Sequence, residues 1–95
     1  MRIVIKPAAY EDIKQTADYI ETELNNPTAA FEIQKSIFKG IERLINQPKL
    51  GKKLRDSEYR YIIIRYYLVF YTIDDDKISI IRILDGRTDY IKYLF

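Results

Sequence analysis

The sequence predicts an α+β domain in which a helical hairpin packs on one face of a four-stranded, mostly antiparallel sheet. A short β-branched run comes first, and two segments with the apolar period of amphipathic helices follow it. Three segments rich in Ile, Tyr, Val and Phe come last, as expected of a three-stranded antiparallel meander. With 95 residues, the chain is long enough for one such domain, spanning 1–95, and not for two.

The first strand is expected at Arg2–Lys6 and ends at Pro7, a residue that fits the first turn of a helix. The first helix is expected over residues 8–25. Its apolar residues recur at spacings of three and four and predict a core-facing stripe of Ala9, Ile13, Ala17, Ile20 and Leu24. Asp12 falls off this stripe with the other charged residues of the segment.

A second helix is expected after the break at Asn25–Thr28, with Asn26 as its cap and Pro27 at its first position. Residues at helical spacing again predict a buried stripe, here Ala30, Ile33, Ile37, Ile41 and Leu44. The segment Asn46–Pro48 ends this helix. A short connection between two amphipathic helices is typical of a helical hairpin.

The strands of the meander are expected at Tyr59–Arg65, Tyr67–Ile73 and Lys77–Leu84, after a loop at Gly51. Asp74–Asp76 predicts the turn between the last two strands. The turn at Arg65 and Tyr66 contains no Gly, Asn or Pro, so its position is predicted only from the strands on either side.

Composition excludes several kinds of catalytic site. The chain has no cysteine and no histidine, which excludes disulfides, thiolate zinc sites, catalytic Ser-His-Asp triads and histidine metal sites. Acid–base chemistry would have to use Asp, Glu, Lys, Arg or Tyr. No metal or other cofactor is expected, because the carboxylates of Asp74–Asp76 cannot all point at one ion.

The N-terminal segment predicts a cytoplasmic protein. It carries Arg2, Lys6, Glu11 and Asp12 and has no apolar stretch typical of a signal peptide. No segment approaches the ~20 apolar residues that a membrane helix needs, so no membrane partner is expected.

Basic residues gather in the middle of the chain. The net charge is only +2, but one segment, residues 49–65, holds Lys49, Lys52, Lys53, Arg55, Arg60 and Arg65 against two acidic residues. Such a patch is typical of a surface that binds nucleic acid or an acidic protein partner. A solvated loop kept soluble by its lysines explains the charge of this patch equally well.

Two segments of the C-terminal half carry a family resemblance. Tyr67–Tyr71 is a tyrosine-bounded strand, and Leu84–Tyr90 reads Leu-Asp-Gly-Arg-Thr-Asp-Tyr at the end of the next. Together with the element order, they resemble the RelE/ParE superfamily of type II toxin–antitoxin systems. The resemblance implies a growth-inhibiting toxin of the kind that stabilises plasmids, with a cognate antitoxin as partner. Its target would be DNA gyrase or the ribosome with its mRNA, and it would reach operator DNA only through the antitoxin complex.

Departures from the pattern favour a ParE-like toxin over a RelE-like mRNA endonuclease. The arginine, histidine and second arginine of RelE-like enzymes fall on Leu68, Asp85 and Thr88, and their lysine pair falls near Tyr59 and Tyr61. A gyrase inhibitor is therefore expected first. A ribosome-dependent endonuclease using Arg65, Arg87 and Tyr90 with Lys52 and Lys53 stays open, as does an inactive toxin that binds only its antitoxin.

Residues expected to bind the target or nucleic acid are Lys49, Lys52, Lys53, Arg55, Arg65, Arg82, Arg87 and Tyr93. Arg82 stands in an apolar strand and must find a counter-ion or reach solvent, so a structural ion pair with Asp85 or a helix carboxylate is favoured. A functional role is favoured for Arg87. Packing on the sheet is favoured for Tyr90 and Tyr93, because tyrosines often bury the ring and leave the hydroxyl in water.

Overall fold

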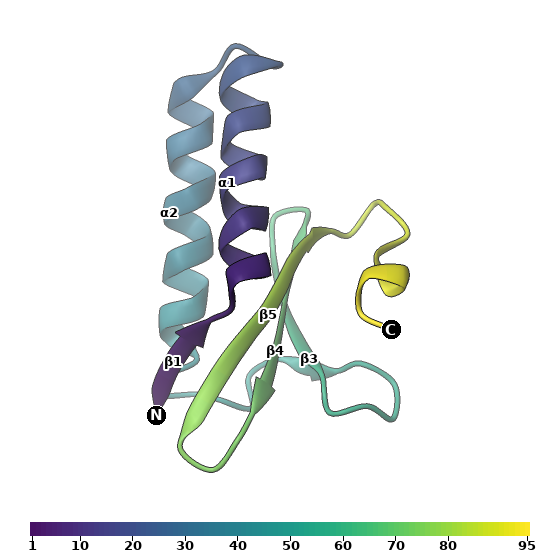
Figure 1. Cartoon of the computed structure of the whole chain (residues 1–95). Coiled ribbons are helices and arrows are strands. Elements are labelled where there is room, and N and C mark those ends of the chain that lie inside the picture. The colour runs from purple at the N-terminus through teal and green to yellow at the C-terminus, as the bar shows by residue number, and fades with distance from the viewer.

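The chain folds into two antiparallel helices packed on one face of a mixed sheet, with a short C-terminal segment on the other face (Figure 1). The computed structural model describes all 95 residues. The helices are α1 (Pro7–Thr22) and α2 (Pro27–Arg43). The predicted α+β class and the helical hairpin are confirmed, with helix ends within three residues of those expected.

The sheet has five strands in the order β1-β5-β4-β3-β2, one more than predicted. Their bounds are Arg2–Ile5 for β1, Lys52–Lys53 for β2, Arg60–Ile64 for β3, Tyr67–Ile73 for β4 and Lys77–Asp85 for β5. β1 pairs in parallel with β5, and the other pairs are antiparallel. The added strand β2 is two lysines long, too short for any period to predict it.

The predicted core stripes of both helices face the sheet, with one exception. Ala9, Ile13 and Ala17 are buried on α1, and all five stripe residues after Pro27 are buried. Leu24 was predicted to lie in the core, but it is 57% exposed. The reason is visible in Figure 1, where the tip of the hairpin extends past the end of the sheet and has no strand beneath it.

Local signals fix the start of each helix. Pro7 and Pro27 occupy first-turn positions, where no backbone N–H is needed. The Asn26 side chain accepts a hydrogen bond from the Ala29 N–H at 3.0 Å, which confirms its predicted role as a cap.

The main core lies between the helices and the sheet. Ile37, Val69, Tyr71 and Ile80 are fully buried there. The hydroxyl of Tyr71 accepts a hydrogen bond from the Gly51 N–H at 2.9 Å and donates one to the Pro48 carbonyl at 2.8 Å. Burial raises the pKa of Tyr71, although the Gly51 N–H and Arg60 oppose that rise. The core thus anchors the backbone of residues 48–55, which carry Lys49, Lys52, Lys53 and Arg55 and which we call the basic loop.

Glycine is required at position 51 by close approach. A Cβ atom there would lie 2.7 Å from both the Tyr61 carbonyl oxygen and the Tyr71 hydroxyl. Arg60 donates a further hydrogen bond to the Gly51 carbonyl at 2.9 Å. The loop that the sequence marks with a glycine is therefore held rigidly against the sheet.

A bulge in β5 changes which residues face the helices. Tyr71 pairs with Ile80 and Phe70 with Arg82, so Ile81 is an extra residue. Ile78 and Ile80 belong to the main core before the bulge, and Ile83 belongs to it afterwards. With strict alternation Arg82 would point into that core, so the bulge is what keeps its charge out.

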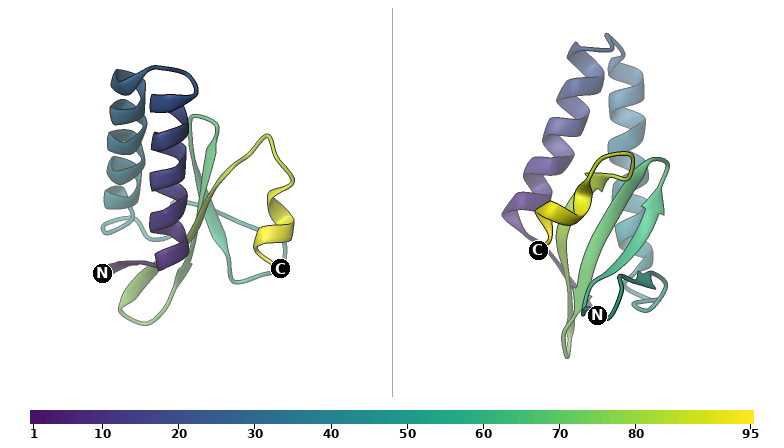
Figure 2. Two further views of the ribbon diagram at one scale, coloured as in Figure 1. Left: turned by 45° about the horizontal axis from the view of Figure 1, so that its top comes forward. Right: turned by 90° about the vertical axis from the view of Figure 1, so that its right-hand side faces the viewer.

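The opposite face of the sheet carries a second, smaller apolar cluster. Leu54, Leu68, Phe70 and Leu84 are buried in it. The C-terminal segment, which contains the short 3-10 helix Tyr90–Tyr93, covers this cluster, as the two views of Figure 2 show. Tyr90 packs its ring 5.6 Å from that of Phe70. No helix of the chain has the length and apolar character that crossing a bilayer requires.

Candidate functional site

Arg82 is held by a carboxylate of α1 at the open edge of β5. β1 ends where the Lys6 N–H donates to the Ile80 carbonyl, and the chain then turns away into α1. Beyond that point, the side chain of Asp12, which is only 9% exposed, binds the backbone of β5 where β1 no longer does. Its Oδ2 accepts from the Ile83 N–H at 2.9 Å, and its two oxygens bind the Arg82 guanidinium at 2.7 and 2.8 Å.

This bidentate pair is structural. The hydrogen bonds to Asp12 raise the pKa of Arg82, against the opposing effect of burial. Arg82 also lies over the ring of Tyr93, with 5.4 Å between the guanidinium carbon and the ring centre. The structural ion pair favoured for Arg82 therefore exists, with a helix carboxylate and not with Asp85.

Arg87 forms a second, more exposed pair with Asp85. Its Nε and Nη2 donate to the two Asp85 oxygens at 3.0 and 2.7 Å, and its backbone N–H donates at 2.9 Å. These hydrogen bonds lower the pKa of Asp85. The guanidinium also stacks on Tyr66, 4.3 Å from the ring centre. Both groups are thus oriented at the surface, where a partner can reach them.

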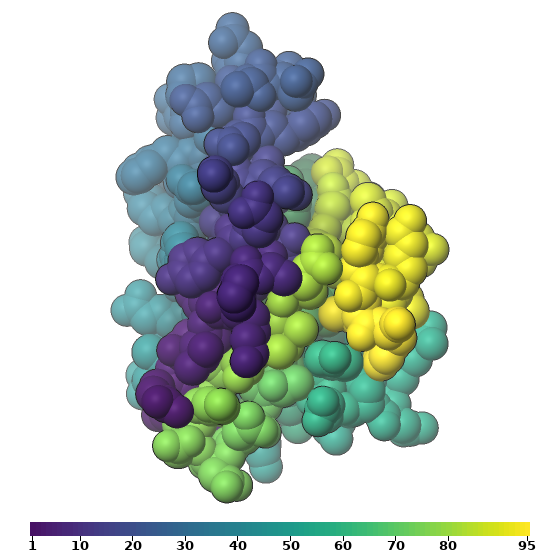
Figure 3. All heavy atoms as spheres, in the orientation of Figure 1, coloured from purple at the N-terminus to yellow at the C-terminus, as the bar shows by residue number.

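Arg82, Arg87 and Tyr93, three of the predicted target-binding residues, line one open groove of about 440 Å³. We call it the α1 groove, because it runs between that helix and the segment from Ile83 to Tyr93. Figure 3 shows it as a recess between the purple helix and the yellow C-terminal segment. Tyr67 also lines it, and burial and the nearby Asp85 charge raise the pKa of this tyrosine.

Next to the α1 groove lies a smaller apolar recess of about 240 Å³, which we call the hairpin hollow. It is the space left under the overhanging tip of the helices. Five residues line it from the hairpin, namely Tyr19, Ile20, Leu24, Ala29 and Ile33, and four line it from the sheet side, namely Arg65, Tyr66, Tyr67 and Arg87. Arg87 therefore belongs to both recesses, and Arg65 joins it only in this one.

Arg65 occupies an unusual backbone conformation. It is the first residue of the two-residue turn between β3 and β4, with φ of 57°. Such tight hairpins require positive φ, which glycine or asparagine adopts more readily than arginine. The turn predicted at Arg65 and Tyr66 is where expected, although its residues are not the usual ones.

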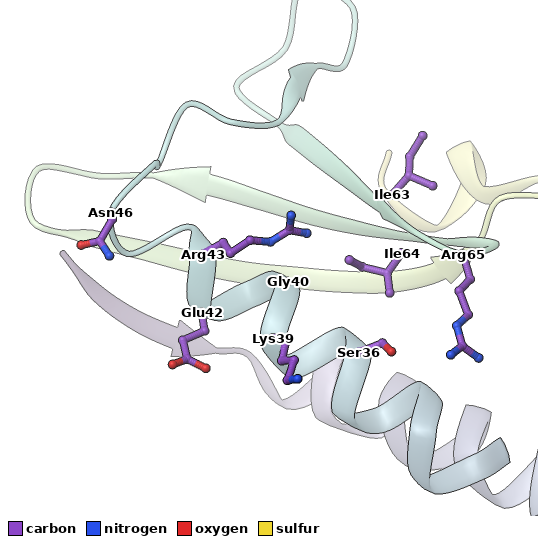
Figure 4. A pocket seen from close by; sticks show the side chains of 9 residues that line it. All are labelled: Ser36, Lys39, Gly40, Glu42, Arg43, Asn46, Ile63, Ile64 and Arg65. Carbon is purple, nitrogen blue, oxygen red and sulfur yellow. The ribbon is translucent and has the colours of Figure 1, made fainter. Parts of the chain in front are cut away.

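The largest recess, about 700 Å³, lies between α2 and the outer edge of β3 (Figure 4). We call it the edge groove. β2 pairs only with Arg60 and Tyr61, so the rest of β3 has no strand on the side away from β4. Ile63 is 62% exposed at this edge. Lys39, Arg43 and Arg65 line the groove against the single acidic residue Glu42.

The basic loop lies apart from Arg82 and Arg87. Lys49 and Lys53 border one small recess with Arg60, and Lys52 borders another with Arg43. Arg55 is exposed, lines none of the recesses and has a positive φ of 55°. No recess brings these residues together with Arg82 or Arg87.

The residues of the endonuclease alternative are likewise dispersed. Tyr90 is packed on Phe70, whereas Arg65 and Arg87 line the hairpin hollow, and Lys52 and Lys53 border two other recesses. Leu68, which replaces the arginine of RelE-like enzymes, is 7% exposed within the second apolar cluster. That face of the sheet is therefore filled with apolar side chains.

Sequence reasoning missed the part played by Asp12. Its position beside Ile13 on the helix, together with a lone arginine inside an apolar strand, was a usable signal. Tyr66 and Tyr67 line the recesses with the arginines, but the sequence placed Tyr66 only in a turn and Tyr67 only in a strand that carries the family resemblance.

Known proteins with this pattern were found by sequence family and by structure. A family described as the ParE toxin of the type II toxin–antitoxin system parDE matches residues 3–90. The fold is similar to that of a chain from "Chromosomal ParDE TA system from P. aeruginosa", with a TM-score of 0.79 and 17% identity over 90% of this chain and 95% of that one. A search of curated protein sequences found no match.

Proposed function

This chain belongs to the ParE toxins of type II toxin–antitoxin systems, and we propose that it arrests growth by binding DNA gyrase. Membership confirms the superfamily, and the ParE-like character, that Tyr67–Tyr71 and Leu84–Tyr90 predict. A toxin of such a system has a cognate antitoxin as partner. The gyrase target, the cytoplasmic location and the growth arrest are parts of the proposal.

The observation that carries the proposal is the apolar face of the sheet. Leu54, Leu68, Phe70 and Leu84 fill it, and Tyr90 covers it. Cleavage of RNA needs groups that activate the 2′-hydroxyl, stabilise the phosphate and protonate the leaving oxygen. Leucine and phenylalanine side chains supply none of these groups, and the ring of Tyr90 is packed on Phe70. This favours inhibition by binding over inhibition by cleavage.

The experiment is the supercoiling of relaxed plasmid by purified DNA gyrase with increasing amounts of this protein. We expect supercoiling to fall as the protein is added, with nothing else required. Supercoiling that is unaffected at a large molar excess would refute the gyrase target. Primer extension on mRNA from cells expressing the protein would then separate the alternatives, because cuts at ribosomal A sites identify an endonuclease and normal growth identifies an inactive toxin.

The edge groove supports the antitoxin half of the proposal. An extended segment can add to the free edge of β3 through main-chain hydrogen bonds, and its apolar side chains can cover Ile63. Lys39, Arg43 and Arg65 favour an acidic segment. Contact with operator DNA would then come through the antitoxin complex.

A charge placed on this edge tests that arrangement. The variant Ile63→Asp should weaken binding of the cognate antitoxin, because the new charge repels an acidic segment and the apolar contact is lost. Isothermal titration of the purified pair would measure this. Unchanged affinity would place the antitoxin elsewhere on the toxin.

A further inference from the structure

We infer that the hairpin hollow is a docking site for one bulky apolar side chain carried by an acidic protein segment. The inference deepens the proposed function. It rests on that proposal in one respect, namely that the acidic segment belongs to the target. Its physical basis is the shape, lining and charge of a recess that neither the core nor the C-terminal segment fills.

The shape of the hollow follows from the different lengths of its two walls. Helices of 16 and 17 residues rise about 25 Å. The sheet ends lower, at the turn between β3 and β4, and leaves the inner side of the hairpin tip without a strand (Figure 1). The space beneath the tip, about 240 Å³, has room for a single large side chain and not for a helix or a strand.

The lining is suited to an aliphatic or aromatic side chain. Ile33 is buried, Ile20 is partly buried, and Leu24 stands at the rim with more than half of its surface in water. Tyr66, 60% exposed, closes the opposite side. Large apolar groups exposed together around a recess are typical of interaction sites. The wall is mixed, because four aliphatic side chains line it beside Tyr19, Tyr66 and Tyr67. An apolar side chain can contact both parts, whereas a nucleic-acid base would find a stacking partner only on the tyrosine rings.

The charge at the rim selects an acidic neighbour. Arg65 and Arg87 line the hollow, and no acidic residue does. Arg65 takes part in no ion pair, and Arg87 shares its charge with Asp85 at the far side. Carboxylates flanking the inserted side chain would find both guanidinium groups at the rim, which are well suited to binding carboxylates.

The backbone of Arg65 supports a role for its side chain. A left-handed turn position is better filled by glycine or asparagine, so arginine here breaks a local rule. Such departures from local preference are expected at functional sites. A symmetric dimer formed through the hollow would bring four arginines together at the rim, which disfavours that form of self-association.

The test uses nuclear magnetic resonance of the isotope-labelled full chain and two synthetic hexapeptides. Both peptides have a Leu-Phe centre, one flanked by Asp and Glu and the other by Lys. The methyl signals of Ile20, Leu24 and Ile33 should shift saturably with the acidic peptide and at least tenfold more weakly with the basic one. Equal response to both peptides, or none up to about 2 mM, would overturn the inference.

Three variants separate the apolar and charged contributions. Leu24→Ser should weaken binding of the acidic peptide roughly threefold to tenfold through lost apolar contact. Arg65→Asp should weaken it roughly tenfold, and aspartate tolerates the left-handed backbone. Lys14→Glu, an exposed charge reversal on α1 outside the hollow, is the matched control and should bind normally. Loss in all three, or in none, would contradict the assignment.

Other occupants of the hollow would give different results. Single-stranded DNA that shifts the same methyl signals as strongly as the acidic peptide would identify a nucleic-acid site and overturn the inference. Shifts that depend on protein concentration alone would identify a second copy, with the same consequence. Because no gyrase is present, failure here is distinct from failure of the supercoiling assay, which tests the proposed target.

Discussion

The two arginine–carboxylate pairs of this molecule have the same chemistry and opposite surroundings. Asp12 and Arg82 are 70 residues apart in the sequence and join α1 to the edge of β5. Asp85 and Arg87 are two residues apart and lie in an exposed turn. The Asp12 side chain is 9% exposed, whereas that of Arg87 is 63% exposed.

The difference shows which arginine the fold needs and which it leaves available. Asp12 accepts from a strand N–H and pairs with a partly buried guanidinium at once, so removing it takes the acceptor from both groups. Asp85 only orients a guanidinium that water already solvates, and such surface pairs contribute little stability. Arg82 is therefore committed to the fold, whereas Arg87 stays exposed at the surface and is the arginine that we propose for binding the target.

The largest expected effect comes from breaking the buried pair. Asp12→Ala should lower the free energy of unfolding by about 2–3 kcal/mol, because Arg82 and the Ile83 N–H both lose their acceptor. Urea denaturation followed by circular dichroism would measure it. Asp18→Ala, which removes an exposed carboxylate from the same helix, is the control and should stay within about 0.5 kcal/mol. If both variants lost the same free energy of unfolding, the pair of Asp12 and Arg82 would contribute no more than an exposed charge, which would contradict this prediction.

An amide at position 12 should have an intermediate effect. Asp12→Asn keeps an oxygen for the Ile83 N–H but removes the charge that holds Arg82, so we expect a loss of about 1–2 kcal/mol. Combining it with Arg82→Met in a double-mutant cycle would isolate the ionic part. A double variant as unstable as the sum of the two single variants would deny any coupling between the residues.

Breaking the exposed pair should affect stability less. Asp85→Ala removes acceptors for the Arg87 side chain and N–H, and we expect a loss of about 0.5–1 kcal/mol. The same denaturation measurement applies, with Asp89→Ala as a nearby control. A loss as large as that of Asp12→Ala would remove the distinction between the two pairs.

The smallest effect is an acid-dependent one. Arg87 lowers the pKa of Asp85, so the folded state binds the proton less readily than the unfolded state. The contribution is therefore complete above the ordinary Asp pKa of about 3.9 and is lost as pH falls through the lowered value. The stability difference between the natural chain and Asp85→Asn should shrink below about pH 4. A difference that is constant from pH 6 to pH 2 would contradict this.

Local pattern was sufficient to predict most of the fold. Apolar residues at spacings of three and four gave both helices, and Pro7, Asn26 and Pro27 marked where they start. β-rich segments gave four of the five strands. The two features that the sequence did not predict depend on non-local contacts. Leu24 has the right period, but no strand lies under it. The two-residue β2 forms where Tyr71 and Arg60 hold the loop against β3.

The candidate site could be predicted only in part, for a similar reason. Arg82 inside an apolar strand demanded a counter-ion, but the sequence could not choose between Asp85 and a helix carboxylate. The bulge at Ile81 turns Arg82 out of the core, and Asp12 binds it at the edge of β5 that β1 leaves open. No residue type signals either feature. The recesses under the hairpin and beside β3 depend on where the sheet stops, which a residue pattern does not specify.

The most direct test of the central claim is gyrase inhibition by Arg87→Gln, compared with the natural chain. The account predicts that roughly tenfold more of the variant is needed to halve supercoiling, as for an arginine central to an interface. Its thermal midpoint should change by less than about 4 °C, as for the loss of a surface contact. Inhibition that equals that of the natural chain, with the variant fully folded, would contradict the assignment of Arg87 to the target surface.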